Sequence, residues 1–337
     1  MADLTTKYMG LNLKNPIIAG ASNLVLEPDN LKKMEDAGVA AIVYKSLFEE
    51  QIELERLQLS EELNQYNERH AEMISLFPDV EHAGPTEHLL NLRKAVEAVN
   101  IPVIASLNCL FEDTWIEYAK AIEQTGVNAI ELNFYSVPGD FKKEEKNIIN
   151  EQLDVVNHVK KSLRIPVSVK LSPFYTNALN LIQMMYFEGV DGFVLFNRLF
   201  QPDIDVEKET HYFPYNLSHE EDSRLALRFI GLLHGEIRGS LCANSGIFTG
   251  KDVIKLLLAG ADCVQVVSTL YKHGIGYVSG MLDEIREWMD EKKYTSLDQF
   301  RGKLSRKQLK DPFAYKRGQY VDILMKSEEI FKRYPMR

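Results

Sequence analysis

Short apolar runs alternate with longer amphipathic segments through most of the chain. The intervening segments carry apolar residues at helical spacing, as in Trp115, Ala119 and Ile122. The apolar runs have the length of buried strands and lie at residues 16–22, 41–47, 102–108, 129–134, 166–172, 192–197, 239–244 and 263–267. This alternation predicts eight βα units that form a parallel sheet wrapped by helices.

Eight such units in one chain favour a closed (β/α)8 TIM barrel, an α/β fold, over an open doubly wound sheet. No G-x-G-x-x-G sequence follows the first run, which weakens a dinucleotide-binding alternative. Residues 5–9 and 11–15 flank Gly10, and we expect them to form an N-terminal β-hairpin that closes the floor of the barrel.

Three segments exceed a minimal barrel, at residues 48–84, 199–222 and 294–337. The first two follow strand ends, so they are expected to be insertions over the catalytic face. The third lies beyond the last barrel helix. We therefore expect a barrel domain at residues 1–293 and a helical C-terminal extension at residues 294–337, packed on the barrel.

Composition and charge narrow the classes of function. The 337 residues carry a formal net charge of −10, which argues against general binding to nucleic acid or to an anionic membrane. The N-terminus has no apolar signal core, and no run approaches the roughly 18 apolar residues of a spanning helix. Cys109, Cys242 and Cys263 are far apart and form no metal-ligand spacing, which favours a reduced, cytoplasmic protein without a metal site.

Two turns of small residues follow the last two predicted strands. They are Asn244-Ser245-Gly246 and Val267-Ser268-Thr269. Adjacent turns of this kind can direct backbone N–H groups at one phosphate, and a helix that starts just beyond adds the favourable end of its dipole. In (β/α)8 barrels the loops after strands 7 and 8 form such a site, so the pair predicts a phosphorylated ligand.

Polar side chains also stand at the ends of the other predicted strands. Strand ends in a barrel point into one shared site. A lysine inside an apolar strand, such as Lys170, must lose its water unless it faces a ligand or a partner. Lys45 and several asparagines join it on the same rim. The combination predicts a ligand site rather than strand ends that reach solvent.

In order and spacing, these sequences resemble the dihydroorotate dehydrogenase family of FMN-dependent barrels. The resemblance runs from about residue 11 to residue 270. It is carried by Asn15-Pro-Ile-Ile-Ala-Gly-Ala-Ser22, Val43-Tyr-Lys-Ser46, Ile130-Glu-Leu-Asn133, Val169-Lys-Leu-Ser-Pro173, Asn197, Asn244-Ser-Gly-Ile-Phe-Thr-Gly250 and Gly260-Ala-Asp-Cys-Val-Gln-Val-Val-Ser-Thr-Leu270. It implies an FMN-dependent oxidoreductase that oxidises dihydroorotate or a related small substrate.

The resemblance also implies which residues bind the cofactor and the substrate. The cofactor-binding set would be Ala21, Ser22, Lys45, Ser46, Asn133, Lys170, Asn244, Ser245, Gly246, Ser268 and Thr269. The substrate-binding set would be Lys45, Asn133 and Asn197. Lys170 would lie near the pyrimidine ring of the flavin, where a cation stabilises the negative charge that develops when the flavin accepts hydride.

The catalytic base of this family lies on the loop after the fourth strand. It removes a proton from C5 of dihydroorotate while hydride leaves C6 for flavin N5. The best alignment of that loop places Ser136 at this position, with a two-residue deletion directly after it, and Lys45 is the second catalytic candidate. A serine is a poor base near neutral pH and would need a relay through water or a hydroxyl. Cys109, just past the third strand, is the alternative acid/base.

The substrate half of the site departs further from the family. The family's Asn-x-Met-Gly-Leu-Pro-Asn loop has no counterpart in residues 48–84. Two other functions therefore stay open beside the oxidoreductase. One is a non-flavin phosphate-binding barrel, a lyase or an isomerase that works through Lys45 or Lys170. The other is a flavin-binding protein that has lost the dehydrogenase chemistry. Soluble members of the family are commonly dimers, so the resemblance also implies a homodimer.

Overall fold

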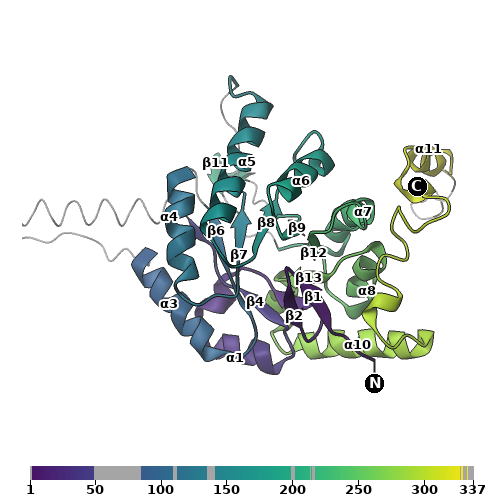
Figure 1. The fold of residues 1–337 in the computed structure, drawn as a ribbon. Coiled ribbons are helices and arrows are strands. Elements are labelled where there is room, and N and C mark those ends of the chain that lie inside the picture. The colour runs from purple at the N-terminus through teal and green to yellow at the C-terminus, as the bar shows by residue number, and fades with distance from the viewer. Residues whose placement is uncertain are drawn as a thin grey trace, which may run out of the picture.

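The computed structural model describes residues 2–48, 85–108, 112–134, 141–198, 202–212 and 217–326, together with positions 214, 328 and 332. Its centre is a parallel sheet surrounded by helices (Figure 1). The principal strands are β3 (Ile17–Ala19), β4 (Ala41–Val43), β6 (Val103–Asn108), β7 (Ala129–Asn133), β8 (Val167–Leu171), β9 (Gly192–Leu195), β12 (Ser240–Asn244) and β13 (Cys263–Val266). Each of them lies inside one of the apolar runs that predicted it.

The sheet closes on itself into a barrel. The strands follow one another in the order β4-β3-β13-β12-β9-β8-β7-β6, and β4 then pairs with β6 through Ile42 and Val43. A short strand, β5 (Leu47–Phe48), follows β4 along the chain and extends the pairing with β6. The prediction of a (β/α)8 barrel is confirmed.

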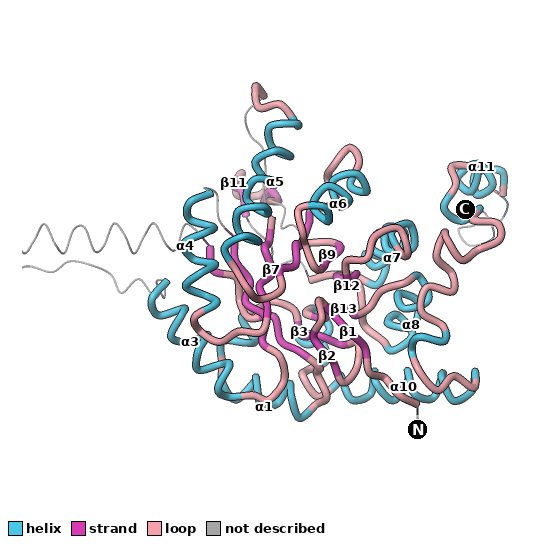
Figure 2. The backbone as a smooth tube through the Cα atoms, viewed as in Figure 1, coloured by secondary structure: helices cyan, strands magenta, loops and turns pink. Residues whose placement is uncertain are grey.

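The helices form the outer layer of the barrel (Figure 2). They are α1 (Pro28–Asp36), α3 (Pro85–Ala98), α4 (Glu112–Glu123), α5 (Glu145–Ser162), α6 (Ala178–Phe187), α7 (Ser223–Leu233), α8 (Gly250–Ala259), the short α9 (Ser268–His273) and α10 (Tyr277–Lys292). The apolar spacing decides which face each helix buries. In α7, Ala226, Ile230 and Leu233 are buried, whereas Arg224 faces solvent.

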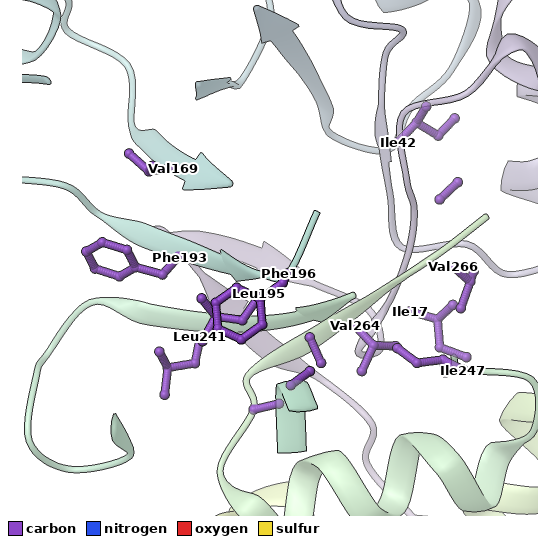
Figure 3. Packing of buried hydrophobic residues seen from close by; sticks show 14 of the residues in the cluster. Ile17, Ile42, Val169, Phe193, Leu195, Phe196, Leu241, Ile247, Val264 and Val266 are labelled. Atoms are coloured by element: carbon purple, nitrogen blue, oxygen red, sulfur yellow. The ribbon is translucent and has the colours of Figure 1, made fainter. Parts of the chain in front are cut away.

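The barrel wall is held by apolar side chains between the strands and the helices. Figure 3 shows Val169, Phe193, Leu195, Leu241 and Val264 in this layer, and all of them are buried. They belong to four neighbouring strands, β8, β9, β12 and β13. Burying one such side chain contributes roughly 1.5–3 kcal/mol, so this layer supplies much of the stability that holds the strand ends in place.

The N-terminal hairpin covers one end of the barrel, as the sequence predicts. Strands β1 (Thr6–Tyr8) and β2 (Leu11–Leu13) pair across a two-residue turn, in which Met9 and Gly10 have φ angles of 51° and 81°. Tyr8 and Leu13 pack against the amino-terminal part of the barrel. The backbone N–H of Met9 donates a 3.0 Å hydrogen bond to Ser240 Oγ at the beginning of β12. The floor of the barrel is therefore closed, and the opposite end carries the loops.

The chain beyond α10 runs along the outside of the barrel. Backbone hydrogen bonds fasten Leu304 N to Leu258 O at 2.8 Å and Arg306 N to Gly231 O at 2.8 Å, which tie the segment to α8 and α7. Two 3-10 turns, η3 (Leu297–Gln299) and η4 (Phe313–Tyr315), precede the terminal helix α11 (Gly318–Met325). None of the helices in the described ranges combines the length and the apolar character needed to cross a bilayer.

Candidate functional site

A cavity opens at the carboxyl ends of the barrel strands. It encloses about 680 Å³ including its open mouth, within the range of roughly 300–1,000 Å³ that is usual for small-molecule sites. Seven of the residues that the sequence predicts as ligand-binding line it: Ala21, Lys170, Asn197, Asn244, Ser245, Gly246 and Ser268. Residues far apart in the sequence thus share one pocket.

The two turns of small residues after β12 and β13 form the predicted phosphate cradle. The first turn contains two residues in the left-handed region. Ser245 has a φ of 75° and Gly246 a φ of 70°. A Cβ on Gly246 would lie 2.4 Å from the backbone nitrogen of Ser223 and 2.7 Å from the carbonyl oxygen of His219. Only glycine fits this close approach to the beginning of α7. The tight turn brings the backbone of β12 to the edge of the cavity.

The second turn begins α9 and is tied to the first. Thr269 Oγ1 donates a hydrogen bond to the carbonyl oxygen of Ile247. Ser268 Oγ accepts two 2.8 Å hydrogen bonds from Ser218, one from its backbone N–H and one from its hydroxyl. Among the described residues, the backbone N–H groups of Gly246, Ile247, Ser268 and Thr269 have no acceptor. Four donors on two linked turns can therefore bind one anion.

A capping box holds the segment that follows the first turn. Asp252 accepts hydrogen bonds from the backbone N–H groups of Phe248 at 3.2 Å and Thr249 at 3.1 Å, and Thr249 Oγ1 accepts from Asp252 N at 3.2 Å. Burial by itself would raise the pKa of Asp252, but Lys255 and these N–H groups together hold it below its usual value. The ionised carboxylate stabilises the first turn of α8, and this helix start holds the segment that follows the Ser245–Gly246 turn.

A buried charged group lies beside the cradle. Lys170 on β8 is 6% exposed, and Glu131 on β7 and Gln265 on β13 are each 1% exposed. Gln265 Nε2 donates a 2.5 Å hydrogen bond to Glu131 Oε2, and Lys170 Nζ donates a 3.4 Å hydrogen bond to Gln265 Oε1. Lys170 Nζ lies 3.7 Å from Glu131 Oε1. The lysine lines the cavity with its position set by two buried partners.

An amide cluster forms another part of the rim. Asn197 Nδ2 donates a 2.9 Å hydrogen bond to Asn133 Oδ1, and Asn108 Nδ2 donates a 2.5 Å hydrogen bond to the backbone oxygen of Asn133. Nearby along β6, Ser106 Oγ shares a 2.6 Å hydrogen bond with Ser46 Oγ. These contacts orient Asn133 and Asn197, and within the described residues they leave one polar group of each side-chain amide for a ligand.

The remaining predicted residues occupy different positions. Ser22 Oγ is buried and has no hydrogen-bond partner in the part of the chain that the structure describes. Lys45 is partly exposed after β4 and does not line the described cavity. Burial lowers the pKa of His88 to about 4, and the positive charge of Lys45 adds to the effect. Ser136 and Cys109, the two candidates for the base, lie outside the described residues.

Glu131, Gln265, Arg198 and Ser218 line or support the cavity, although no role was assigned to them from the sequence. The sequence could have identified Glu131 and Gln265 as candidate site residues, because each is a polar residue inside an apolar strand. No sequence pattern identified Arg198 and Ser218, because they lie in or beside the long insertion after β9. Arg198 Nη1 lies 2.5 Å from Asp222 Oδ2, and Arg198 lines the cavity with Ser218.

Fold and site together define a (β/α)8 barrel protein whose pocket suits a phosphorylated ligand. Two turns offer backbone donors, and the buried Lys170 and the partly buried Arg198 add positive charge to the same cavity. This local charge contrasts with the net charge of −10 of the whole chain.

Comparison with known proteins agrees with this class. A family model described as dihydroorotate dehydrogenase matches residues 61–289, more than half of the chain. The "Dihydroorotate dehydrogenase B (NAD(+)), catalytic subunit" of Thermoplasma volcanium is 26% identical over 90% of this chain and 98% of its own length. The subunit of the same name from Methanocaldococcus jannaschii is 26% identical over 87% of this chain and 95% of its own length. The "Dihydroorotate dehydrogenase A (fumarate)" of Lactobacillus delbrueckii subspecies bulgaricus is 29% identical over 56% of this chain and 62% of its own length.

The chain belongs to the dihydroorotate dehydrogenase family, and it is an FMN-dependent oxidoreductase of that type. The resemblance that the strand-end sequences indicate is thereby confirmed, and the lyase or isomerase alternative is wrong. The residues present fit the cofactor. The absence of a side chain at Gly246 lets the turn lie against the beginning of α7, four N–H groups are available on the two turns, and the Ser22 hydroxyl is buried without a partner among the described residues.

The variant Gly246→Ala is expected to lower the affinity for FMN by at least about tenfold, or about 1.4 kcal/mol. Its Cβ would overlap the backbone of Ser223 and displace the cradle turn. Fluorescence titration of the apoprotein with FMN measures the change. Gly10→Ala is the matched control, because Gly10 also has a positive φ of 81° but no atom within 4 Å of the added Cβ, and it lies at the floor of the barrel. Equal losses in both variants would contradict the assignment of the cradle.

Proposed function

We propose that the protein oxidises dihydroorotate or a related small substrate, with proton abstraction by a residue of the loop after β7. The observation that carries this proposal is the cavity that joins the phosphate turns, Lys170 and Asn197 at the carboxyl ends of the strands. The names of the relatives, all dihydroorotate dehydrogenases, support the choice of substrate.

The cofactor-binding residues divide into two groups in this proposal. Ser245, Gly246, Ser268 and Thr269 would hold the phosphate through their turns, with Asn244 supporting the first turn by its 2.8 Å hydrogen bond to Phe196 O. The residues near the ring system would be Ala21, Ser22, Lys45, Ser46, Asn133 and Lys170. When bound, FMN supplies the hydride acceptor. The ammonium group of Lys170 would stabilise negative charge at the pyrimidine end of the flavin.

Substrate recognition is proposed for Lys45, Asn133 and Asn197. The hydrogen bond between Asn133 and Asn197 holds both amides at the rim, so their free groups can bind the polar edge of a small ring. Lys170 and Arg198 line the cavity, and Lys45 follows β4, which pairs with β3 and β6. The two cations in the cavity wall favour a substrate that carries a negative charge, such as a carboxylate.

Ser136 is proposed as the catalytic base, with Lys45 as a second catalytic residue. Ser136 follows Asn133 by three positions, and Asn133 ends β7 at the rim of the barrel. A residue so soon after this strand end can reach a substrate held by the amide cluster. The serine would pass the proton on through a water or a hydroxyl.

The decisive experiment for the function is anaerobic mixing of the FMN-loaded protein with dihydroorotate. We expect the visible absorbance of the oxidised flavin to bleach, because the substrate reduces the bound cofactor. Dithionite serves as the control that the bound flavin can be reduced. A flavin that bleaches with dithionite but not with dihydroorotate would exclude this substrate and favour a flavin-binding protein without the dehydrogenase chemistry.

The variant Ser136→Ala is expected to slow substrate-driven flavin reduction by about 10²-fold or more while FMN stays bound, because the proton acceptor is lost. Stopped-flow absorbance under anaerobic conditions measures the rate. Cys109→Ala is the comparison variant. Slow reduction in Cys109→Ala with a normal rate in Ser136→Ala would move the role of the base to Cys109.

We also propose that residues 1–293 are the FMN-binding barrel and that residues 294–337 are an extension that makes a homodimer contact. Helix α11 supports this, because five successive or nearly successive apolar side chains on it are at least half exposed: Tyr320, Val321, Ile323, Leu324 and Met325. Two of the relatives are named as catalytic subunits, so a different partner subunit is the alternative.

Light scattering is expected to give twice the chain mass of 38.6 kDa for the protein and a monomer for Leu324→Asp. A charge placed in an apolar interface opposes its burial. Phe187→Asp is the matched control, because Phe187 is 74% exposed on a different helix, α6, and should leave the dimer intact. A monomeric unmodified protein would contradict the proposal.

A further inference from the structure

A chain of buried polar side chains crosses the interior of the barrel beneath the cavity. Glu131 and Lys170 come from the adjacent strands β7 and β8, whereas Gln265 comes from β13, which β12 and β9 separate from β8. The amide of Gln265 contacts both charged groups, with its nitrogen on Glu131 Oε2 at 2.5 Å and its oxygen facing Lys170 Nζ at 3.4 Å. A single side chain from the other side of the barrel therefore contacts both members of an ion pair between two adjacent strands.

The two oxygens of the Glu131 carboxylate have different surroundings. Oε2 accepts the hydrogen bond from Gln265, whereas Oε1 is buried and has no hydrogen-bond partner within the described ranges. The nearest cation to Oε1 is Lys170 Nζ at 3.7 Å, which is longer than a hydrogen bond. The attraction between the two groups is therefore mainly Coulombic, and it is screened little because both are almost fully buried.

Lys170 is the member of this chain that reaches the ligand. It lines the cavity together with Gln265, whereas Glu131 does not. A ligand in the cavity can thus contact the ammonium group of Lys170, whereas the carboxylate of Glu131 lies behind that group. The carboxylate offsets part of the positive charge that the ligand meets.

We propose that Glu131 is a redox-tuning residue that acts through Lys170: held by Gln265, its carboxylate positions the ammonium group and limits the positive charge that faces the flavin. This inference rests on the proposed placement of Lys170 beside the flavin ring. A lone buried cation would favour the reduced, more negative flavin strongly. The ion pair moderates that preference, so Glu131 and Gln265 help to set the reduction potential at which the cofactor gives up its electrons.

The test is the midpoint potential of the bound flavin in Glu131→Gln. Glutamine has the shape of glutamate and keeps an oxygen acceptor for Gln265, but it removes the negative charge. We expect the equilibrium constant for two-electron reduction to rise by about tenfold or more, which corresponds to a potential about 30 mV more positive. Equilibration against a reference dye of known potential measures it. An unchanged or a more negative potential would overturn the proposal.

A double-mutant cycle shows whether Glu131 acts through Lys170. In a Lys170→Met background, Glu131→Gln should change the potential little, because the charge that it offsets is gone. The same shift in both backgrounds would overturn the positioning role. If Glu131→Gln does not fold, Glu131→Met replaces it. That variant removes the same negative charge with an uncharged side chain of similar length and should also make the potential more positive, so an unmoved potential would again overturn the proposal.

Asp262→Asn is the matched control. It also removes one carboxylate from the barrel, but at the beginning of β13, where Asp262 Oδ1 lies 3.3 Å from Arg301 Nη1 and Oδ2 accepts a 2.8 Å hydrogen bond from Leu241 N. The flavin potential of Asp262→Asn should equal that of the unmodified protein. An equal shift in Asp262→Asn and Glu131→Gln would contradict a local effect of Glu131. None of these measurements uses dihydroorotate. The potential measurement therefore still tests the role of Glu131 if dihydroorotate is not the substrate. An unmodified protein that binds no FMN would refute both the proposed function and the role of Glu131.

Discussion

Closure of the parallel sheet is the constraint on which the rest of the structure depends. When β4 pairs with β6, every barrel strand gains two neighbours and no edge is left between them. All strands run in the same direction, so their carboxyl ends meet on one rim. The hairpin of β1 and β2 fills the opposite end. The strand-end side chains therefore gather at the open end of the barrel, and the position of the candidate site follows from the closure.

The interior of the barrel also decides the electrostatics of that site. A lysine that is 6% exposed would be costly without a counter-charge, and Glu131 supplies one from the adjacent strand. The two charges do not form a direct hydrogen bond, and Gln265 bridges them instead. The pair keeps a cation available to the cavity in a chain whose net charge is −10. The charge that the cavity presents to a ligand thus depends on local placement rather than on overall charge.

The strands, the hairpin and the phosphate turns could be predicted because their causes are local. Apolar runs such as residues 166–172 have the length of buried strands, and Ser245-Gly246 is a turn whose backbone requires a residue without a side chain. The family membership followed from the order of these short sequences. Partners distant in the chain could not be predicted in this way. Glu131 and Gln265 are 134 positions apart, and Ser218 and Ser268 are 50 positions apart, and no periodicity connects either pair.

By itself the amino-acid sequence determined the barrel, the rim that carries the site and the kind of cofactor, because hydrophobic spacing and turn chemistry act between near neighbours. The tertiary structure alone decided which polar groups meet. It joined Lys170 to Glu131 through Gln265, paired Asn133 with Asn197, and brought Arg198 to Asp222 at the edge of the cavity. These contacts depend on how the closed sheet brings strands of different sequence position together, and the distances within such a pocket decide its charge and its hydrogen bonds.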